Sequence, residues 1–260
     1  MARPAGCSAA DAKGRAQNTS PAAAALALFA VLVAAVLPGC AATSAGGEQV
    51  AETNDPVEPV NRAIFDANMT VDRAVVKPIA QAYQDLPAGV RQGVHNVTSN
   101  LGEPSVTAND LLQGKIDRAL VSAQRFAINT TAGVGGVSDV ATDWKLPPHQ
   151  NDFGETMAVW GLGEGPYLQL PALGPSTLRD AVGTAVGMAL DPLSVTGVQA
   201  LTYLGYARTG AGFVDARATH LQDLDELERN SLDFYASLRS VYLQHRRAEI
   251  DKARQFSAPQ

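Results

Sequence analysis

The sequence predicts a mainly α fold, and three observations support this prediction. Apolar residues recur three and four positions apart over several long segments, which is the spacing that puts side chains on one face of an α-helix. Glycines and Asp-Pro pairs separate these segments, as they do at helix boundaries. One region, residues 133–175, breaks the helical spacing and divides the helices into two groups.

Three helices are expected before residue 133. The first follows Asp55-Pro56, and Pro78 is expected to bend or end it. The second covers about residues 90–101, and the third covers residues 115–131 with Gly133 as its C-terminal stop. Their apolar positions are Val57, Val60, Ile64, Val71, Val75 and Ile79; Val90, Val94, Val97 and Leu101; and Ile116, Leu120, Ala123 and Phe126.

Residues 133–175 contain eight glycines and, from residue 147 onward, five prolines. One regular helix is therefore excluded. Loops fit the composition better, with a short hairpin around residues 161–165.

Helical spacing returns in the last third of the chain. A helix is expected over residues 178–190, capped by Ser176 or Thr177 and broken at Asp191-Pro192. Two more are expected within residues 193–208 and 214–230. The last covers residues 231–252, with the basic pair Arg246-Arg247 near its end, where the helix dipole favours cations. Residues 253–260 are expected to be a disordered tail.

Residues 1–39 are predicted to be a lipoprotein signal peptide. Three basic residues precede an uncharged stretch of 16 residues, 22–37, which is shorter than the roughly 20 that span a bilayer. Leu37-Pro38-Gly39-Cys40 resembles a lipobox, which makes Cys40 the expected lipidation site. A retained membrane helix, or ordinary cleavage that leaves Cys40 as a free thiol, remains open. Residues 40–54 are small and polar and are predicted to be a lipidated tether spanning roughly 20 Å.

Cysteine content and charge narrow the possible functions. Removing residues 1–39 leaves Cys40 as the one cysteine, so no intramolecular disulfide can form. The remaining residues carry 17 Lys and Arg against 25 Asp and Glu, a formal charge of −8. That balance argues against nucleic acid as a partner and against simple electrostatic docking to anionic lipid.

No catalytic or cofactor motif stands out. Gly174-Pro175-Ser176 lacks the second glycine of a hydrolase nucleophile elbow, and Ser176 is better explained as a helix cap. The four histidines are far apart in the sequence and match no metal motif, so only His149 merits testing as a hydrolase residue. The glycine-rich residues 133–136 follow a helix instead of a strand, which argues against a dinucleotide site. We expect no enzyme activity, cofactor or metal.

A series of motifs resembles the MlaA (VacJ) family of phospholipid-handling lipoproteins. The strongest match is FGETMAVWGLGEGPYLQLPALGPSTLRD at residues 153–180. It is joined by NDP at 54–56, NRAIF at 61–65, NLGEP at 100–104, RFAIN at 125–129 and SLDFYASLRSVYLQHRR at 231–247. Residues 55–252 are therefore identified as an MlaA-like helical domain.

The resemblance implies a ring-like arrangement of amphipathic helices, embedded in the inner leaflet of the outer membrane on its periplasmic side and anchored by lipid. Such a protein would sit beside a porin trimer and pass outer-leaflet phospholipids through an amphipathic channel to a periplasmic lipid carrier protein. A structural envelope lipoprotein without transport, or a periplasmic hydrolase, is the alternative.

The resemblance also suggests roles for individual residues. Asn61, Arg62, Phe65, Asn68 and Arg179 are expected to line the lipid channel or to support it, although Ala67 replaces an aromatic residue common in the family. Two other groups are expected near the passage: a gating loop, in which glycine permits bending or a static turn, and two aromatics at the membrane interface or in the core. The loop residues are Gly161, Gly163 and Gly165, and the aromatics are Trp160 and Tyr167.

Overall fold

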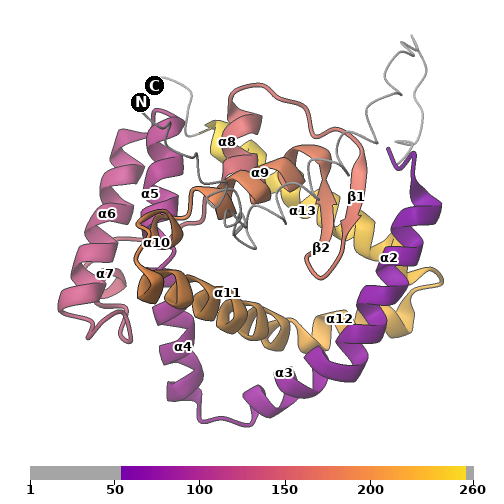
Figure 1. Ribbon diagram of the computed structural model, residues 1–260, viewed down its shortest axis with the longest axis horizontal. Helices are drawn as coiled ribbons and strands as arrows, with labels where there is room; N and C mark the ends of the chain where they lie inside the picture. The colour runs from indigo at the N-terminus through magenta and orange to yellow at the C-terminus, as the bar shows by residue number, and fades with distance from the viewer. Residues whose placement is uncertain (1–53, 256–260) are drawn as a thin grey trace, which may run out of the picture. The chain divides into compact units, whose positions relative to one another are not determined.

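The computed structural model describes residues 54–255. The predicted signal peptide, Cys40 and nearly all of the tether lie outside the described residues. The described part is mainly helical, which confirms the predicted class (Figure 1).

One long helical segment opens the fold. Helix α2 (Glu58–Val71) runs through a π-helical turn, η1 (Asp72–Val76), into α3 (Lys77–Gln84). Pro78 therefore does not end the helix. Proline lacks an N–H and its ring crowds the carbonyl four residues back, and the wider turn before it, in which the Lys77 N–H bonds to the Asp72 carbonyl, accommodates both effects.

Three helices follow: α4 (Ala88–Asn100), α5 (Glu103–Leu112) and α6 (Ile116–Thr131). The periodicity predicted α4 and α6 close to these bounds. It did not predict α5, because the buried residues of α5 are Glu103 and Asp110 and the helix has no apolar stripe to recognise.

The glycine- and proline-rich region contains more regular structure than expected. It forms α7 (Val140–Asp143), α8 (Phe153–Val159) and an antiparallel hairpin of β1 (Tyr167–Leu170) and β2 (Gly174–Thr177). The hairpin exists, but its turn lies at residues 171–173 and not at 161–165. The earlier glycines fail to make that turn because Gly161, at φ 95°, ends α8: the Leu162 N–H bonds to the Met157 carbonyl, as in a Schellman cap.

The remaining helices are α9 (Leu178–Ala189), α10 (Pro192–Val195), α11 (Gln199–Thr219), α12 (Leu221–Asn230) and α13 (Phe234–Gln255). Thr177 caps α9 by accepting the Asp180 N–H, as predicted. The expected break at 208–214 was wrong, since α11 continues through Gly210 and Gly212 and ends before His220. Helix α13 extends three residues beyond the predicted end and buries Ala253, so the predicted tail began too early.

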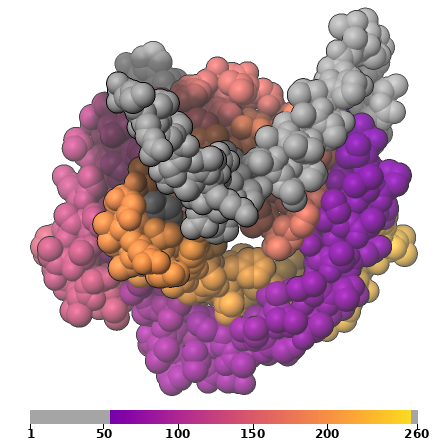
Figure 2. Space-filling model, viewed as in Figure 1, coloured from indigo at the N-terminus to yellow at the C-terminus, as the bar shows by residue number. Residues whose placement is uncertain are grey.

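The helices of residues 54–255 form a closed circuit of contacts, which confirms the ring-like arrangement. In order around the circuit they are α3, α11, α4, α6, α5, α8, α13 and α12, and α12 returns to α3 (Figure 1). The hairpin packs on α2, and Figure 2 shows an opening between α11 and the hairpin. The largest apolar cluster, Phe65, Tyr167, Tyr235 and Leu243, lies where α2, the hairpin and α13 meet.

Candidate functional site

The described residues bury polar side chains and expose apolar ones. Seven of the fourteen buried apolar residues are alanine, whereas eighteen polar or charged residues are buried. Twenty-six large apolar residues of the described part are exposed, and large exposed apolar patches mark contact sites for proteins or membranes.

Several residues of the apolar stripes that predicted the helices are exposed instead of buried. On α2, η1 and α3, Val60, Val71, Val75 and Ile79 are 49–58% exposed, and on α6 Ile116 and Leu120 are 55% and 53% exposed. We call these six residues the outer apolar stripe. The buried face of α6 instead carries Ala119, Ser122, Arg125 and Asn129. No helix within residues 54–255 is both long and apolar enough to cross a bilayer.

Arg125 is the centre of the polar interior. Its guanidinium binds Glu103 of α5 at 2.7 Å, the Leu146 carbonyl at 2.6 Å and Asp139, the N-cap of α7, at 3.1 Å. Arg125 is only 2% exposed. Burial raises the pKa of Glu103, and the Arg125 hydrogen bond partly offsets that rise. The network holds α5, α6 and α7 together without an apolar core.

The two asparagines expected at the channel hold the hairpin onto α2. The Asn61 amide donates to the Tyr167 carbonyl at 3.1 Å and accepts the Gln169 N–H at 2.9 Å. Two helical turns further along α2, the Asn68 amide donates to the Leu170 carbonyl and accepts the Ala172 N–H, at 2.8 and 2.9 Å. Both residues therefore hold the hairpin through its backbone, and a part in lining or supporting a lipid channel stays a prediction.

Arg62 and Phe65 connect α2 to the start of α13. Arg62 binds Asp233 at 2.6 Å and lies 4.4 Å above the ring of Tyr235. Phe65 packs edge-on against Tyr235 and Phe234, with ring centroids 5.4 and 5.5 Å away.

An ionic hub, which the sequence did not reveal, lies beside this contact. The Asp55 carboxylate accepts hydrogen bonds from Asn61, Tyr235 and Arg239, at 2.7, 2.5 and 2.5 Å. Its partners lie up to 184 positions away, so no local pattern could indicate them.

Arg179 is buried at the start of α9 and pairs with its neighbour Asp180 at 3.1 Å. Asp180 also accepts hydrogen bonds from Tyr242 and Arg246 of α13, at 3.0 and 3.1 Å. Burial alone would raise the pKa of Asp180, but the bonds from Arg246 and Thr177 hold it below its ordinary value. The predicted local ion pair is thus one part of a junction between α9 and α13.

The three glycines of the predicted gating loop differ from one another. Gly161 and Gly165 adopt positive φ, 95° and 70°, and a Cβ on Gly165 would lie 3.1 Å from Leu178. These two match the static turn. Gly163 is exposed, and no atom lies within 4 Å of where its Cβ would be. Glu164, which lies between Gly163 and Gly165, forms a 2.7 Å ion pair with Arg247 of α13.

Only one of the two aromatics expected at the membrane interface has the required exposure. Trp160 is 51% exposed and its indole N–H donates to the Leu112 carbonyl at 3.0 Å, so an interface role stays a prediction. Tyr167 is 2% exposed and its hydroxyl donates to Gln169, so the interface assignment was wrong for this residue. It points inward because the alternate residues of β1 face the apolar cluster.

Substitutions at Gly163 and Gly165 can distinguish a loop that must bend from a turn that is needed only for folding. Gly163→Val is expected to fold normally, because it meets neither a steric clash nor a positive φ. It should reduce the lipid transport that the resemblance to the MlaA family implies, because valine restricts backbone freedom. Gly165→Val should lower the thermal midpoint, because φ is 70° there. Thermal unfolding and outer-leaflet phospholipid would be measured for both. Unchanged transport in folded Gly163→Val would exclude bending at this position.

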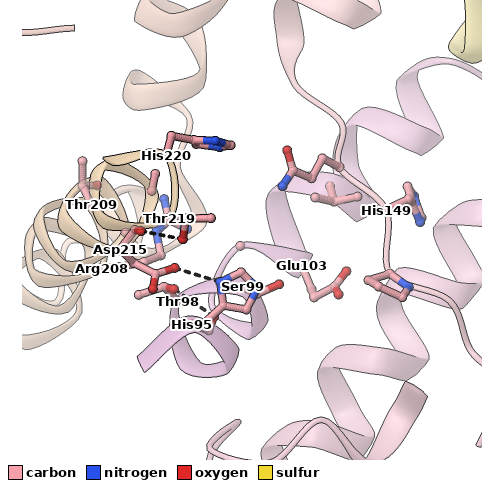
Figure 3. Close-up of a pocket in the computed structure, with 16 residues that line it drawn as sticks. His95, Thr98, Ser99, Glu103, His149, Arg208, Thr209, Asp215, Thr219 and His220 are labelled. Carbon is pink, nitrogen blue, oxygen red and sulfur yellow. Dashed lines mark hydrogen bonds and ion pairs between the residues drawn. The ribbon is translucent and has the colours of Figure 1, made fainter. Parts of the chain in front are cut away.

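A cavity of about 690 Å³ lies between α4, α5, residues 148–150 and α11 (Figure 3). It brings together His95, His149 and His220, which the sequence analysis had treated as unrelated. His95 binds Asp215 of α11 at 2.8 Å, and His149 binds Asp110 of α5 at 2.7 Å.

The arrangement around His149 does not match a hydrolase triad. Ser122 lies 3.3 Å from the ring, but the same atom, Nε2, contacts both Ser122 and Asp110, so the ring cannot relay a proton between them. Ser176 is buried and donates to the Thr177 carbonyl. Within residues 54–255 no three His, Cys, Asp or Glu side chains are placed to hold a metal ion.

Comparisons with known proteins agree on one family. Residues 53–249 match the model of the MlaA lipoprotein family. The intermembrane phospholipid transport system lipoprotein MlaA of Shigella flexneri is 39% identical over 217 residues, covering 80% of this chain and 82% of the relative. The protein of the same name from Haemophilus influenzae is 35% identical, covering 86% and 90%.

A solved structure described as the structural basis for maintenance of bacterial outer membrane lipid asymmetry has a similar fold. Its TM-score is 0.65 at 35% identity, and the match covers 75% of this chain and 98% of that one. Together with the family match over most of the chain, these relatives show that the chain belongs to the MlaA lipoprotein family.

Proposed function

We propose that this protein is a non-enzymatic outer-membrane lipoprotein that removes phospholipids from the outer leaflet and passes them to a periplasmic carrier. The domain at residues 55–252 would lie in the inner leaflet, tethered through residues 40–54 and lipidated Cys40 after loss of residues 1–39. A porin trimer is the proposed neighbour, because such a partner would give the domain a fixed place beside the outer leaflet.

The observation that carries this proposal is the reversed distribution of side chains. The exposed apolar residues suit contact with lipid tails, and the buried polar residues, paired with one another between the helices, hold the circuit together without needing an apolar core. Two acyl chains hold on the order of 30 methylenes, so full exposure to water would cost roughly 25 kcal/mol at about 0.8 kcal/mol each. A closed circuit of amphipathic helices can shield such a molecule along its path.

The outer apolar stripe provides the direct test. Val71→Glu with Val75→Glu is expected to leave a high level of outer-leaflet phospholipid in cells that depend on this protein, because each charge costs about 2–4 kcal/mol in lipid. The matched control is Thr70→Glu with Gln81→Glu, on the other side of the same helical segment, which should restore asymmetry. Outer-leaflet phospholipid would be measured in intact cells with an impermeant amine reagent. Restoration by the Val71/Val75 variant would contradict the proposed lipid contact.

Cys40 is tested separately. Metabolic labelling with a fatty acid should label the parent and not Cys40→Ala, because the proposed acyl chains are attached at Cys40. Two or three such chains give a durable anchor. Phospholipid recovered from the purified parent would support transport, whereas a purely structural envelope lipoprotein should bring none. Equal labelling of both forms would place the anchor elsewhere.

A further inference from the structure

One side of α11 carries exposed aromatic residues and no charge over most of its length. Tyr203, Tyr206, Gly210 and Phe213 share this side, because they are spaced three, four and three positions apart. The three aromatic side chains are 47–61% exposed. We call these four residues the α11 face. It is separate from the outer apolar stripe, which lies on other helices.

The opposite side of α11 packs against α4. The Arg208 guanidinium donates to the carbonyl of Leu101, the C-cap of α4, at 2.8 Å. A Cβ on Gly212 would lie 4.0 Å from Thr98 of the same helix. Because positions 208 and 212 lie across the helix from the α11 face, that face points away from α4.

The α11 face continues to Arg217, whose partner shows where the face points. Arg217 follows Phe213 by four positions, and its guanidinium donates two hydrogen bonds to Asp72 of η1, at 2.8 and 2.9 Å. Asp72 follows Asn68 by four positions, so it shares the side of α2 on which Asn61 and Asn68 hold the hairpin. The α11 face and the hairpin therefore meet the same side of one helical segment.

These contacts place the α11 face at the opening between α11 and the hairpin (Figure 2). The segment of α2 and η1 bounds this opening on a third side, because it holds the hairpin at Asn61 and Asn68 and holds α11 at Asp72. The closed circuit of helices surrounds the opening. A continuous bilayer cannot enter such a circuit, whereas a single lipid molecule can.

We infer that the α11 face is the wall along which an acyl chain of a phospholipid moves through this opening. The inference rests on the proposed function, which supplies the lipid. Gly210 has no side chain and leaves a gap between the large apolar rings of Tyr206 and Phe213. No atom of the described chain lies within 4 Å of where a Cβ of Gly210 would be. An uncharged aromatic face with such a gap fits a flexible hydrocarbon chain and has no group that would retain a charged ligand.

The first test fills the gap. Gly210→Trp is expected to fold, because its Cβ meets no atom and any residue replacing a helical glycine favours the helix. It should nevertheless leave outer-leaflet phospholipid at the level of cells that lack the protein, whereas Gly210→Ala should restore asymmetry. The matched control is Gly89→Trp near the start of α4, where a Cβ also meets no atom within 4 Å.

Thermal unfolding and outer-leaflet phospholipid, assayed with an impermeant amine reagent, would be measured for the three variants. Full asymmetry with folded Gly210→Trp would overturn the inference, because a face that only touches the bilayer tolerates a tryptophan. An equal loss with Gly89→Trp would overturn it as well, since the effect would then not depend on the α11 face.

A second test identifies the occupant and does not require a bulky variant to fold. Benzoylphenylalanine in place of Phe213 keeps an aromatic ring there and should attach to phospholipid when cells grown with ³²P-phosphate are illuminated. The phosphate label does not report the acyl chains proposed at Cys40. The same amino acid in place of Glu226, on the exposed side of α12, is the control and should capture little lipid. Capture of a protein instead of lipid at position 213 would contradict the proposed occupant.

The inference and the proposed function fail separately. If the wild type and folded Gly210→Trp both restore lipid asymmetry, the inference fails and the proposed function stands. If the wild type does not restore asymmetry in cells that lack the protein, the proposed function fails.

Discussion

Arg125→Leu is expected to lower the free energy of unfolding by about 3–5 kcal/mol, because removing one partner of a buried ion pair leaves the other charge without compensation. Arg125 and Glu103 are each only 2–3% exposed and lie 2.7 Å apart. The same substitution also removes the bonds to Asp139 and to the Leu146 carbonyl, which position α7 and the segment after it.

Urea unfolding at pH 7 measures the effect of Arg125→Leu. Arg229→Leu, at an exposed arginine on α12, is the control and should change stability by less than about 0.5 kcal/mol. Combining Arg125→Leu with Glu103→Leu should recover part of the loss, since apolar residues often replace a buried pair at little cost. A midpoint for Arg125→Leu equal to that of the control would mean that the polar interior contributes nothing to stability.

Periodicity predicted where most helices lie, but it could not assign their faces. The spacing of Ile116 and Leu120 correctly placed α6, yet these residues are exposed and Arg125 is buried. Apolar spacing of this kind shows only that the side chains lie on one side of a helix. Whether that side meets a core or a lipid depends on the neighbouring helices, and for α5 the polar interior removed the pattern altogether.

The candidate site was predictable only in part, and for a similar reason. Motif resemblance identified Asn61 and Asn68, but their function depends on the hairpin backbone more than 100 positions away. The alternation of β1 decided that Tyr167 is buried, and this could not be known before the hairpin turn was placed. The cavity that His95, His149 and His220 line forms because α4 and α11 pack together, a contact with no local sequence signal.

Glu155 of α8 is expected to make the protein less stable as the pH rises. It is 7% exposed, and burial, followed by the nearby charge of Asp152, raises its pKa to about 7 from an ordinary 4.5, although Arg246 and Lys115 oppose the rise. Below pH 4.5 the folded and unfolded chains are both protonated at this group, so it has no effect. Between about pH 4.5 and 7 the folded chain holds a proton that the unfolded chain has lost, and stability falls as the pH increases.

Above pH 7 the full cost is present, and a shift of this size corresponds to about 3 kcal/mol. Glu155→Gln, which keeps the shape but cannot ionise, should therefore match the wild type near pH 4 and be more stable by up to about 3 kcal/mol at pH 8. Urea midpoints measured from pH 4 to pH 8 check this, with Glu226→Gln on the exposed side of α12 as the control. If the urea midpoints of Glu155→Gln and the wild type change with pH in the same way, the pKa of Glu155 is the ordinary one, and burying this carboxylate in α8 carries no penalty.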